Sequence, residues 1–176
     1  DVWPELSPAW YAPDPQQVSK RGVMASVNLG AGPAVNAQSQ TIDESSFEGG
    51  WDGWSPTSSG AQIARFADSS APDGDYIVHV SGFGEATLEK TISTVGFTNI
   101  QVAYARGGVW LERNWRGADR FTAEWSIDGG ATWTEIENVT AMDGWGVTTV
   151  DLPAQAEDQP SLTLRFSFRG VNNSWF

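Results

Sequence analysis

The 176-residue chain carries 22 Asp and Glu against ten Lys and Arg, which gives a formal net charge of −12. That charge repels phosphate backbones and anionic membrane surfaces, so nucleic acid is not expected as a partner. With no cysteine, the chain can form neither disulfides nor a thiolate zinc site. No run of residues approaches the apolar length of a membrane-spanning helix, so membrane insertion is not expected either.

Residues 1–40 are predicted to form an extended, proline-rich arm or linker. Each X-Pro step biases the backbone toward extended or turn conformations. One short stretch, residues 22–29, could pair as an edge strand. The X-Pro steps are Trp3-Pro4, Ser7-Pro8, Ala12-Pro13, Asp14-Pro15 and Gly32-Pro33.

Residues 41–176 are predicted to form one jelly-roll domain, because short alternating runs are separated by Gly, Asp, Asn and Pro. In Ser161–Arg169, the apolar side chains recur with a period of two and so share one face of a strand. Residues 120–136 read as a hairpin that turns at Asp128-Gly129-Gly130. The fold class is therefore all-β, an antiparallel two-sheet jelly-roll β-sandwich with an extended N-terminal arm. Further strands are predicted at 62–67, 75–81, 86–92, 97–105 and 144–152.

The hairpin contains the run Ser126-Ile-Asp-Gly-Gly-Ala-Thr-Trp133, which fits the Asp-box pattern S-x-D-x-G-x-T-W in full. It occurs once, whereas a propeller would need repeated blades. An Asp at its third position can accept hydrogen bonds from the turn backbone. We interpret the motif as a folding device without a catalytic role.

The order of several segments resembles the MAM-like and galactose-binding-like β jelly-roll modules of bacterial secreted and surface proteins. The resemblance covers residues 47–176 and implies a module that binds sugars, binds structural calcium or links its neighbours. It implies Glu48 as a calcium ligand, although Glu48 and Asp52 alone supply few oxygen ligands. The segments are Phe47–Trp54, Ala86–Ile100, Phe121–Trp133 and Leu162–Arg169.

Modules of this kind usually end with one more strand than this sequence provides. The apparent absence of that strand would leave Ser161–Arg169 with an open edge, which favours strand addition. We therefore expect Val23–Leu29, or a strand donated by a neighbouring chain in a homo-oligomer, to fill the place beside it.

The stretch 106–119 concentrates Trp and Arg in an otherwise acidic chain. Aromatic rings can stack on pyranose rings, and guanidinium groups can bind hydroxyl or carboxylate groups. The alternative is that these Trp side chains only cap one end of the sandwich. The predicted carbohydrate-binding or interface residues are Trp110, Arg113, Trp115, Arg116 and Trp175.

No catalytic constellation is recognisable in the sequence. The single histidine, His79, lies in a predicted strand, and no G-x-S-x-G nucleophile elbow is present. A glycosidase would need two carboxylates facing one cleft, for which Glu89 and Glu124 are the best candidates. Their sequence contexts do not match those of jelly-roll xylanases, so we do not expect an enzyme.

The sequence thus predicts a noncatalytic extracellular binding module, secreted or at the cell surface, whose partner is a carbohydrate. This module is expected to require no cofactor, although it could bind structural calcium. The alternative is a structural or adhesive subunit of a fibre, sheath or particle, with neighbouring protein subunits as partners and assembly by strand complementation.

Overall fold

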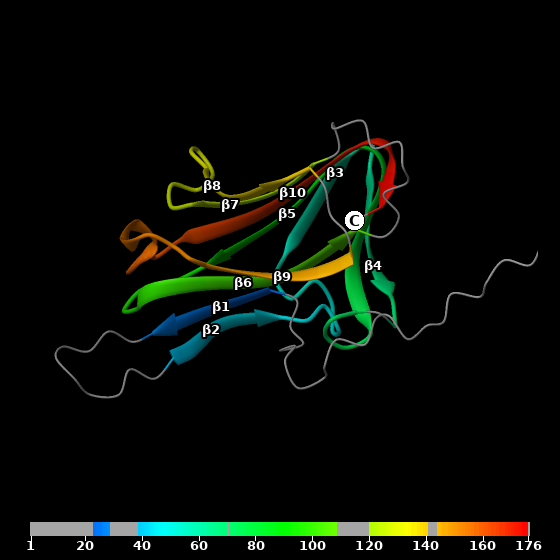
Figure 1. The fold of residues 1–176 in the computed structure, drawn as a ribbon. Coiled ribbons are helices and arrows are strands. Elements are labelled where there is room, and N and C mark those ends of the chain that lie inside the picture. The colour runs from blue at the N-terminus through cyan, green and yellow to red at the C-terminus, as the bar shows by residue number, and fades with distance from the viewer. Residues whose placement is uncertain (1–22, 29–38, 70, 109–119, 141–143, 176) are drawn as a thin grey trace, which may run out of the picture.

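The computed structural model describes residues 23–28, 39–69, 71–108, 120–140 and 144–175 and shows two antiparallel sheets (Figure 1). The predicted all-β sandwich is confirmed. Among the described residues, no helix has the length and apolar character to cross a membrane. The first sheet has the order β2 (Ser39–Ser45), β1 (Val23–Asn28), β6 (Thr98–Gly108), β9 (Gly144–Asp151). The second has the order β3 (Ser55–Ser59), β5 (Tyr76–Ile92), β10 (Leu162–Trp175), β7 (Arg120–Ser126), β8 (Thr134–Val139), and β4 (Gln62–Ala67) also pairs with β5. A short 3₁₀ helix, η2 (Ala154–Ala156), follows β9.

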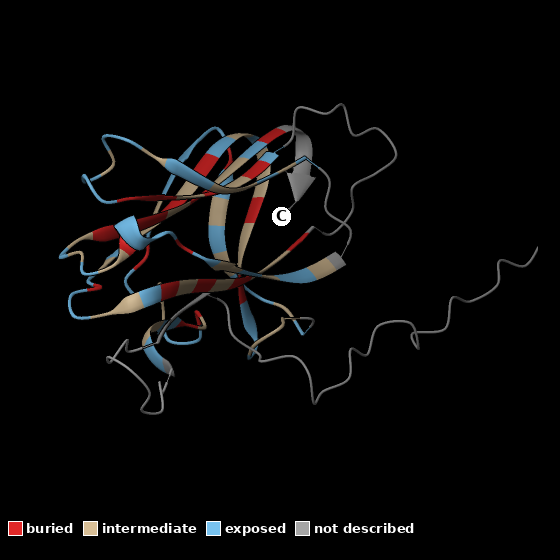
Figure 2. Cartoon of the chain, turned by 60° about the vertical axis from the view of Figure 1, so that its left-hand side comes forward, coloured by how far each residue is buried: buried red, intermediate tan, exposed pale blue. Residues whose placement is uncertain are grey.

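An aromatic core lies between the two sheets. Phe166 of β10 has its ring centroid 4.9 Å from that of Tyr104, 5.3 Å from that of Trp54 and 5.9 Å from that of Phe121. All four side chains are buried. Buried positions alternate with more exposed ones along the strands, as the period of two predicts (Figure 2).

Strand β5 is a single strand of 17 residues, whereas the sequence suggested two strands, at 75–81 and 86–92. Its first half pairs with β4, and its second half pairs with β3 and β10. Between the halves lie Gly82 and Gly84, with φ values of 92° and 121°. A Cβ at Gly84 would lie 2.1 Å from the carbonyl oxygen of Ser59, so this position requires glycine. The glycines therefore let one strand serve both halves of the sheet.

The predicted open edge beside Ser161–Arg169 is wrong. Strand β10 is paired along one side with β5 and along the other with β7, so it is an internal strand. The strand expected to fill that edge, β1, pairs instead with β2 and β6 in the opposite sheet, where it too is internal. Residues 23–28 of the predicted arm are therefore part of the sandwich, while residues 1–22 and 29–38 lie outside the described residues.

The predicted hairpin is confirmed, with β7 and β8 joined through the Asp-box turn. The Asp128 carboxylate accepts hydrogen bonds from the Ser126 hydroxyl (2.7 Å) and from the Thr132 backbone N–H (2.9 Å) and hydroxyl (2.5 Å). The Ser126 hydroxyl oxygen in turn accepts from the N–H of Gly130 (2.9 Å). The hydrogen bonds from Thr132 and Ser126 lower the pKa of Asp128 far below its usual range. The motif thus fixes the turn, as the sequence predicted.

Candidate functional site

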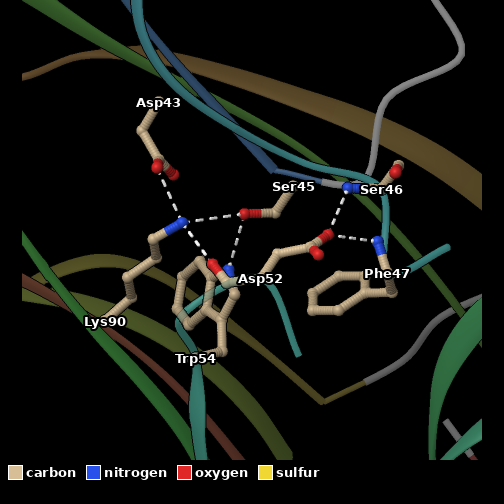
Figure 3. Close-up of polar contacts among 7 residues, drawn as sticks. All are labelled: Asp43, Ser45, Ser46, Phe47, Asp52, Trp54 and Lys90. Carbon is tan, nitrogen blue, oxygen red and sulfur yellow. Dashed lines mark hydrogen bonds and ion pairs between the residues drawn. The ribbon is translucent and has the colours of Figure 1, made fainter. Parts of the chain in front are cut away.

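A lysine joins the two sheets at one edge of the sandwich (Figure 3). The Lys90 ammonium group, on β5, lies 2.6 Å from Asp43 Oδ1 on β2. It also donates to the Asp52 carbonyl oxygen (2.6 Å) and to Ser45 Oγ (3.1 Å). Only 11% of the Lys90 side chain is exposed, so these oxygens replace water around the charge. We call Lys90 with Asp43, Ser45 and the Asp52 carbonyl the lysine clamp.

The lysine clamp also fixes the loop between β2 and β3. The Asp52 carboxylate accepts the backbone N–H groups of Ser46 (3.0 Å) and Phe47 (2.7 Å), while the Trp54 indole N–H donates to Ser45 Oγ (2.9 Å) (Figure 3). Phe47 and Asp52 have φ values of 63° and 49°, which only a tightly bonded loop would hold. As a result, the Phe47 side chain is buried at one end of the core.

Glu48, the predicted calcium ligand, has a different set of contacts. Its Oε1 accepts the backbone N–H groups of Asp75 and Tyr76, both at 2.8 Å, where β5 begins. Arg65 donates to the carbonyl oxygens of Phe47 (2.6 Å) and Glu48 (2.8 Å), so a guanidinium group already binds the nearby backbone oxygens. Within the described part of the chain, no group of three or more Asp, Glu, His or Cys could hold a metal ion. The surroundings of Glu48 therefore do not fit a hard-cation site.

An arginine joins the two sheets at the other edge. The Arg106 guanidinium group on β6 makes two hydrogen bonds to the Glu137 carboxylate on β8, one of them from Nε at 2.8 Å. The Tyr104 hydroxyl donates to the same carboxylate at 2.8 Å, and Thr148 of β9 approaches it at 3.5 Å. The side chains of Arg106 and Glu137 are 22% and 18% exposed. We call Arg106, Glu137 and Tyr104 the arginine clamp.

The arginine clamp shifts the pKa values of its members. Burial alone would raise the pKa of Glu137, but the hydrogen bonds from Arg106 and Tyr104 and the charge of Arg106 outweigh it and lower that pKa. Burial, together with the Glu137 hydrogen bond, raises the pKa of Tyr104 well above its usual range. The Glu137 hydrogen bond raises the pKa of Arg106. The clamp is thus a charged pair with a neutral phenol donor.

A cavity of about 80 Å³ opens at the end of the core where β6 ends and β9 begins. Its floor is made of buried side chains from four strands, namely Leu88, Tyr104, Phe121 and Phe166. More exposed groups from the loops and strand ends form its mouth, namely Phe168, Trp145, Tyr76, Asp73 and Arg106. Both clamps contribute to the cavity wall, because the lysine clamp holds the loop of Phe47 and the arginine clamp includes Tyr104 and Arg106, which all line the cavity. The mouth combines aromatic rings with charged groups, as small-ligand sites commonly do.

Four of the residues predicted to bind carbohydrate, Trp110, Arg113, Trp115 and Arg116, lie outside the described residues. The stretch that contains them, 109–119, joins β6 to β7. Gly107 on one side of this stretch and Phe121 on the other both line the cavity. Trp175 lies in β10 opposite Ser81, but its side chain is outside what the structure describes.

The carboxylates considered for glycosidase chemistry do not belong to the cavity. Glu89 and Glu124 lie on β5 and β7, both opposite Arg165 on the intervening strand β10. Arg165 bonds Glu124 at 2.8 Å and stacks on Trp133 at 3.7 Å from the ring centroid. The His79 ring packs against the ring of Phe66 on β4, with centroids 5.5 Å apart, and burial lowers the pKa of His79. None of these groups lines the cavity among the described residues.

Neither clamp was predicted, although the sequence contains a signal for each. Lys90 continues the inward-facing series of Ala86 and Leu88, and Arg106 continues that of Val102 and Tyr104. A charge on the core face of a strand must be paired, since burying an unpaired charge is costly. The missing information was the identity of the partners, because Asp43 and Glu137 lie far away in the sequence.

Comparisons with known proteins show the fold of this chain but do not assign it to a family. No family model matches the chain, and no curated protein matches it either. Among solved structures, the chain is similar to TmCBM61 in complex with β-1,4-galactotriose, with a TM-score of 0.54 and 16% identity over 73% of this chain and 86% of that one. A structure of promiscuous carbohydrate-binding modules of the β-sandwich superfamily matches with a TM-score of 0.46 and 16% identity over 89% of this chain and 70% of that one. The first similarity shows that the chain has the β-sandwich fold seen in a carbohydrate-binding module.

Proposed function

We propose that this chain is a noncatalytic carbohydrate-binding module that works outside the cell or at its surface. The observation that carries the proposal is the cavity mouth, where Tyr76, Trp145 and Phe168 lie with Arg106 and Asp73 at one end of the sandwich. Aromatic side chains offer apolar faces to sugar rings, and charged groups offer hydrogen bonds to hydroxyls. The described residues Gly107 and Phe121, on either side of the predicted binding stretch in the sequence, also line this cavity.

The fold supports the same proposal. TmCBM61, whose sandwich this chain resembles, is described in complex with β-1,4-galactotriose. Because a fold can host many functions, this similarity suggests β-1,4-galactan as the first glycan to test and does not identify the ligand. A galactose-binding-like jelly roll agrees with the observed sandwich, and a MAM-like relationship remains part of the proposal. The position of Glu89 and Glu124 outside the cavity favours binding without hydrolysis.

The alternative, a structural subunit assembled by strand complementation, has lost its main support. It depended on an open edge beside Ser161–Arg169, and β10 is paired there on both sides. No observation among the described residues favours it over carbohydrate binding.

The test is affinity electrophoresis of the full chain in gels that contain β-1,4-galactan, followed by a glycan array. We expect retardation in the gel, and we expect Tyr76→Ala and Trp145→Ala each to weaken binding roughly threefold to tenfold. Phe83→Ala is the matched control, because Phe83 is an aromatic residue with 60% exposure that does not line the cavity. Trp110→Ala and Trp115→Ala test the sequence-predicted site in the same assay.

Binding to no polysaccharide or array glycan would overturn the proposed function. Binding that is unchanged in both cavity variants would move the site elsewhere on the sandwich. Thermal melts of each variant establish that a loss of binding is not a loss of fold.

A further inference from the structure

We propose that the cavity receives a small methyl-bearing substituent of the glycan, such as an acetyl ester or the C6 methyl group of a 6-deoxy sugar. The sugar ring itself would then lie at the mouth. This inference rests on the proposed function and specifies which glycans the site selects.

The size of the cavity favours a substituent over a ring. Its volume of about 80 Å³ is roughly half that of the ~150 Å³ apolar cavity known to hold benzene in another protein. A six-membered sugar ring with its hydroxyls is larger than benzene. A methyl or acetyl group, with one to three heavy atoms, fits the available space.

The chemistry of the floor favours the same occupant. The floor side chains Leu88, Phe121 and Phe166 are 2 to 5% exposed and present only carbon. A sugar hydroxyl placed against them would lose its water without gaining a partner, which is unfavourable. The one polar floor group, the Tyr104 hydroxyl, already donates to Glu137. A methyl group is therefore the part of a glycan that gains most from entering.

The mouth supplies the polar groups that a sugar ring needs. Asp73, Ser46 and Arg106 line the cavity together with the half-buried Trp145. Arg106 is held by Glu137, so its guanidinium plane is fixed before any ligand arrives. This layering, polar outside and apolar inside, matches a sugar ring that carries an apolar substituent.

Two valines offer a matched pair of positions. Val78 on β5 lines the cavity and packs against the core, whereas Val95 is 54% exposed and does not line the cavity. Val78→Ile and Val78→Leu each add one carbon atom at the cavity wall, in different positions, and so narrow the space where the substituent would lie. Val95→Ile adds the same carbon atom away from the cavity and is the control.

The experiment measures binding of the full chain to glycan pairs that differ only in the substituent. One arm compares an acetylated polysaccharide with the same polymer after mild alkaline deacetylation. The other compares glycans ending in L-fucose with those ending in L-galactose, which carries a hydroxyl at C6. We expect the methyl-bearing member of at least one pair to bind roughly fourfold tighter or more. Val78→Ile and Val78→Leu should reduce this preference, while Val95→Ile should leave it unchanged.

The outcomes separate this inference from the proposed function. Glycan binding without any preference, or a preference that Val78→Leu and Val78→Ile both leave intact, overturns the inference and leaves the proposed function standing. Binding to no glycan overturns both. Thermal melts show whether Val78→Leu is folded, and Val78→Ile decides the matter if it is not.

Discussion

The lysine clamp and the arginine clamp connect the same two sheets at opposite edges by different chemistry. Lys90 is surrounded by one carboxylate, one hydroxyl and one backbone carbonyl, two of which belong to the loop and strand end that carry Phe47. Arg106 binds one carboxylate through two hydrogen bonds, and Tyr104 donates to that same group. A compact ammonium group can organise a loop, whereas a planar guanidinium group fixes one carboxylate in one orientation.

The two clamps differ in how strongly the stability of each edge depends on a single residue. In the arginine clamp, Glu137 is the shared acceptor of at least three donors, so its removal leaves several buried groups without a partner. In the lysine clamp, the charge is spread over acceptors that keep other contacts, since Ser45 also binds the Trp54 indole. We therefore expect the arginine edge to depend on one residue more strongly than the lysine edge does.

Removal of the Glu137 carboxylate should give the largest loss of stability. Glu137→Ala leaves the Arg106 guanidinium group and the Tyr104 hydroxyl mostly buried and unpaired, which we expect to cost about 2–3 kcal/mol. Urea denaturation followed by tryptophan fluorescence measures the change. Glu135→Ala, at an exposed position on the same strand, is the control and should change stability by less than about 0.5 kcal/mol. Equal effects of the two substitutions would mean that the arginine clamp contributes little.

Removal of the Lys90 ammonium group should have a smaller effect. Lys90→Met keeps most of the packing volume and removes the charge from Asp43, Ser45 and the Asp52 carbonyl, at an expected cost of about 1–2 kcal/mol. Arg169→Met is the control, because the Arg169–Glu85 pair is exposed and 3.8 Å apart. A cost for Lys90→Met above that of Glu137→Ala, measured in the same denaturant series, would reverse the comparison.

Acid should weaken the arginine clamp. The pKa of Glu137 is lowered in the folded state, so its contribution is present above about 4.5, the ordinary value, and is lost as pH falls through the lowered pKa. Denaturation midpoints measured from pH 7 to pH 3 should therefore fall less steeply for Glu137→Gln than for the unmodified chain. Lys90→Met retains the arginine clamp and should keep the Glu137 share of the acid loss. Parallel curves for Glu137→Gln and the unmodified chain below pH 4.5 would contradict this assignment.

The Asp-box turn should give the smallest effect, because it fixes one hairpin and joins no sheets. Asp128→Ala removes the acceptor of Thr132 and Ser126, so we expect the melting temperature to fall by less than it does in Lys90→Met. Hydrogen exchange should speed up in residues 120–139 and stay unchanged in β1 and β6. A melting temperature as low as that of Glu137→Ala would show that the turn supports the whole sandwich.

Local patterns in the sequence were enough to predict several strands and the hairpin. The alternation of Leu162, Leu164, Phe166 and Phe168 needs no partner to be recognised, and Asp128-Gly129-Gly130 marks its own turn. The pairing partners of the strands could not be predicted from such local patterns. The neighbours of β10 and the place of β1 depend on how the whole core packs. The family resemblance predicted an open edge beside β10, although both edges of that strand are paired.

The candidate site was harder to predict than the fold for the same reason. The cavity is lined by residues from the loop of Phe47, from strand starts near Tyr76 and Trp145, and from strand ends near Arg106. Each of these positions is unremarkable in its own segment. Of the sequence-predicted stretch 106–119, the described residues Arg106 and Gly107 line the cavity.

The central position of β10 has a consequence for the order in which the chain can fold. Leu162 pairs with Ile92, and Leu164 with Trp125, so β10 closes the ladder between two strands that precede it in the sequence. Until β10 arrives, β5 and β7 each have an unpaired inner edge, and Phe166 is missing from the middle of the aromatic core. Pairings between residues so distant in sequence are slow to form. We therefore expect the second sheet to assemble only after translation has passed residue 169, with the exposed edges of β5 and β7 open to mispairing until then.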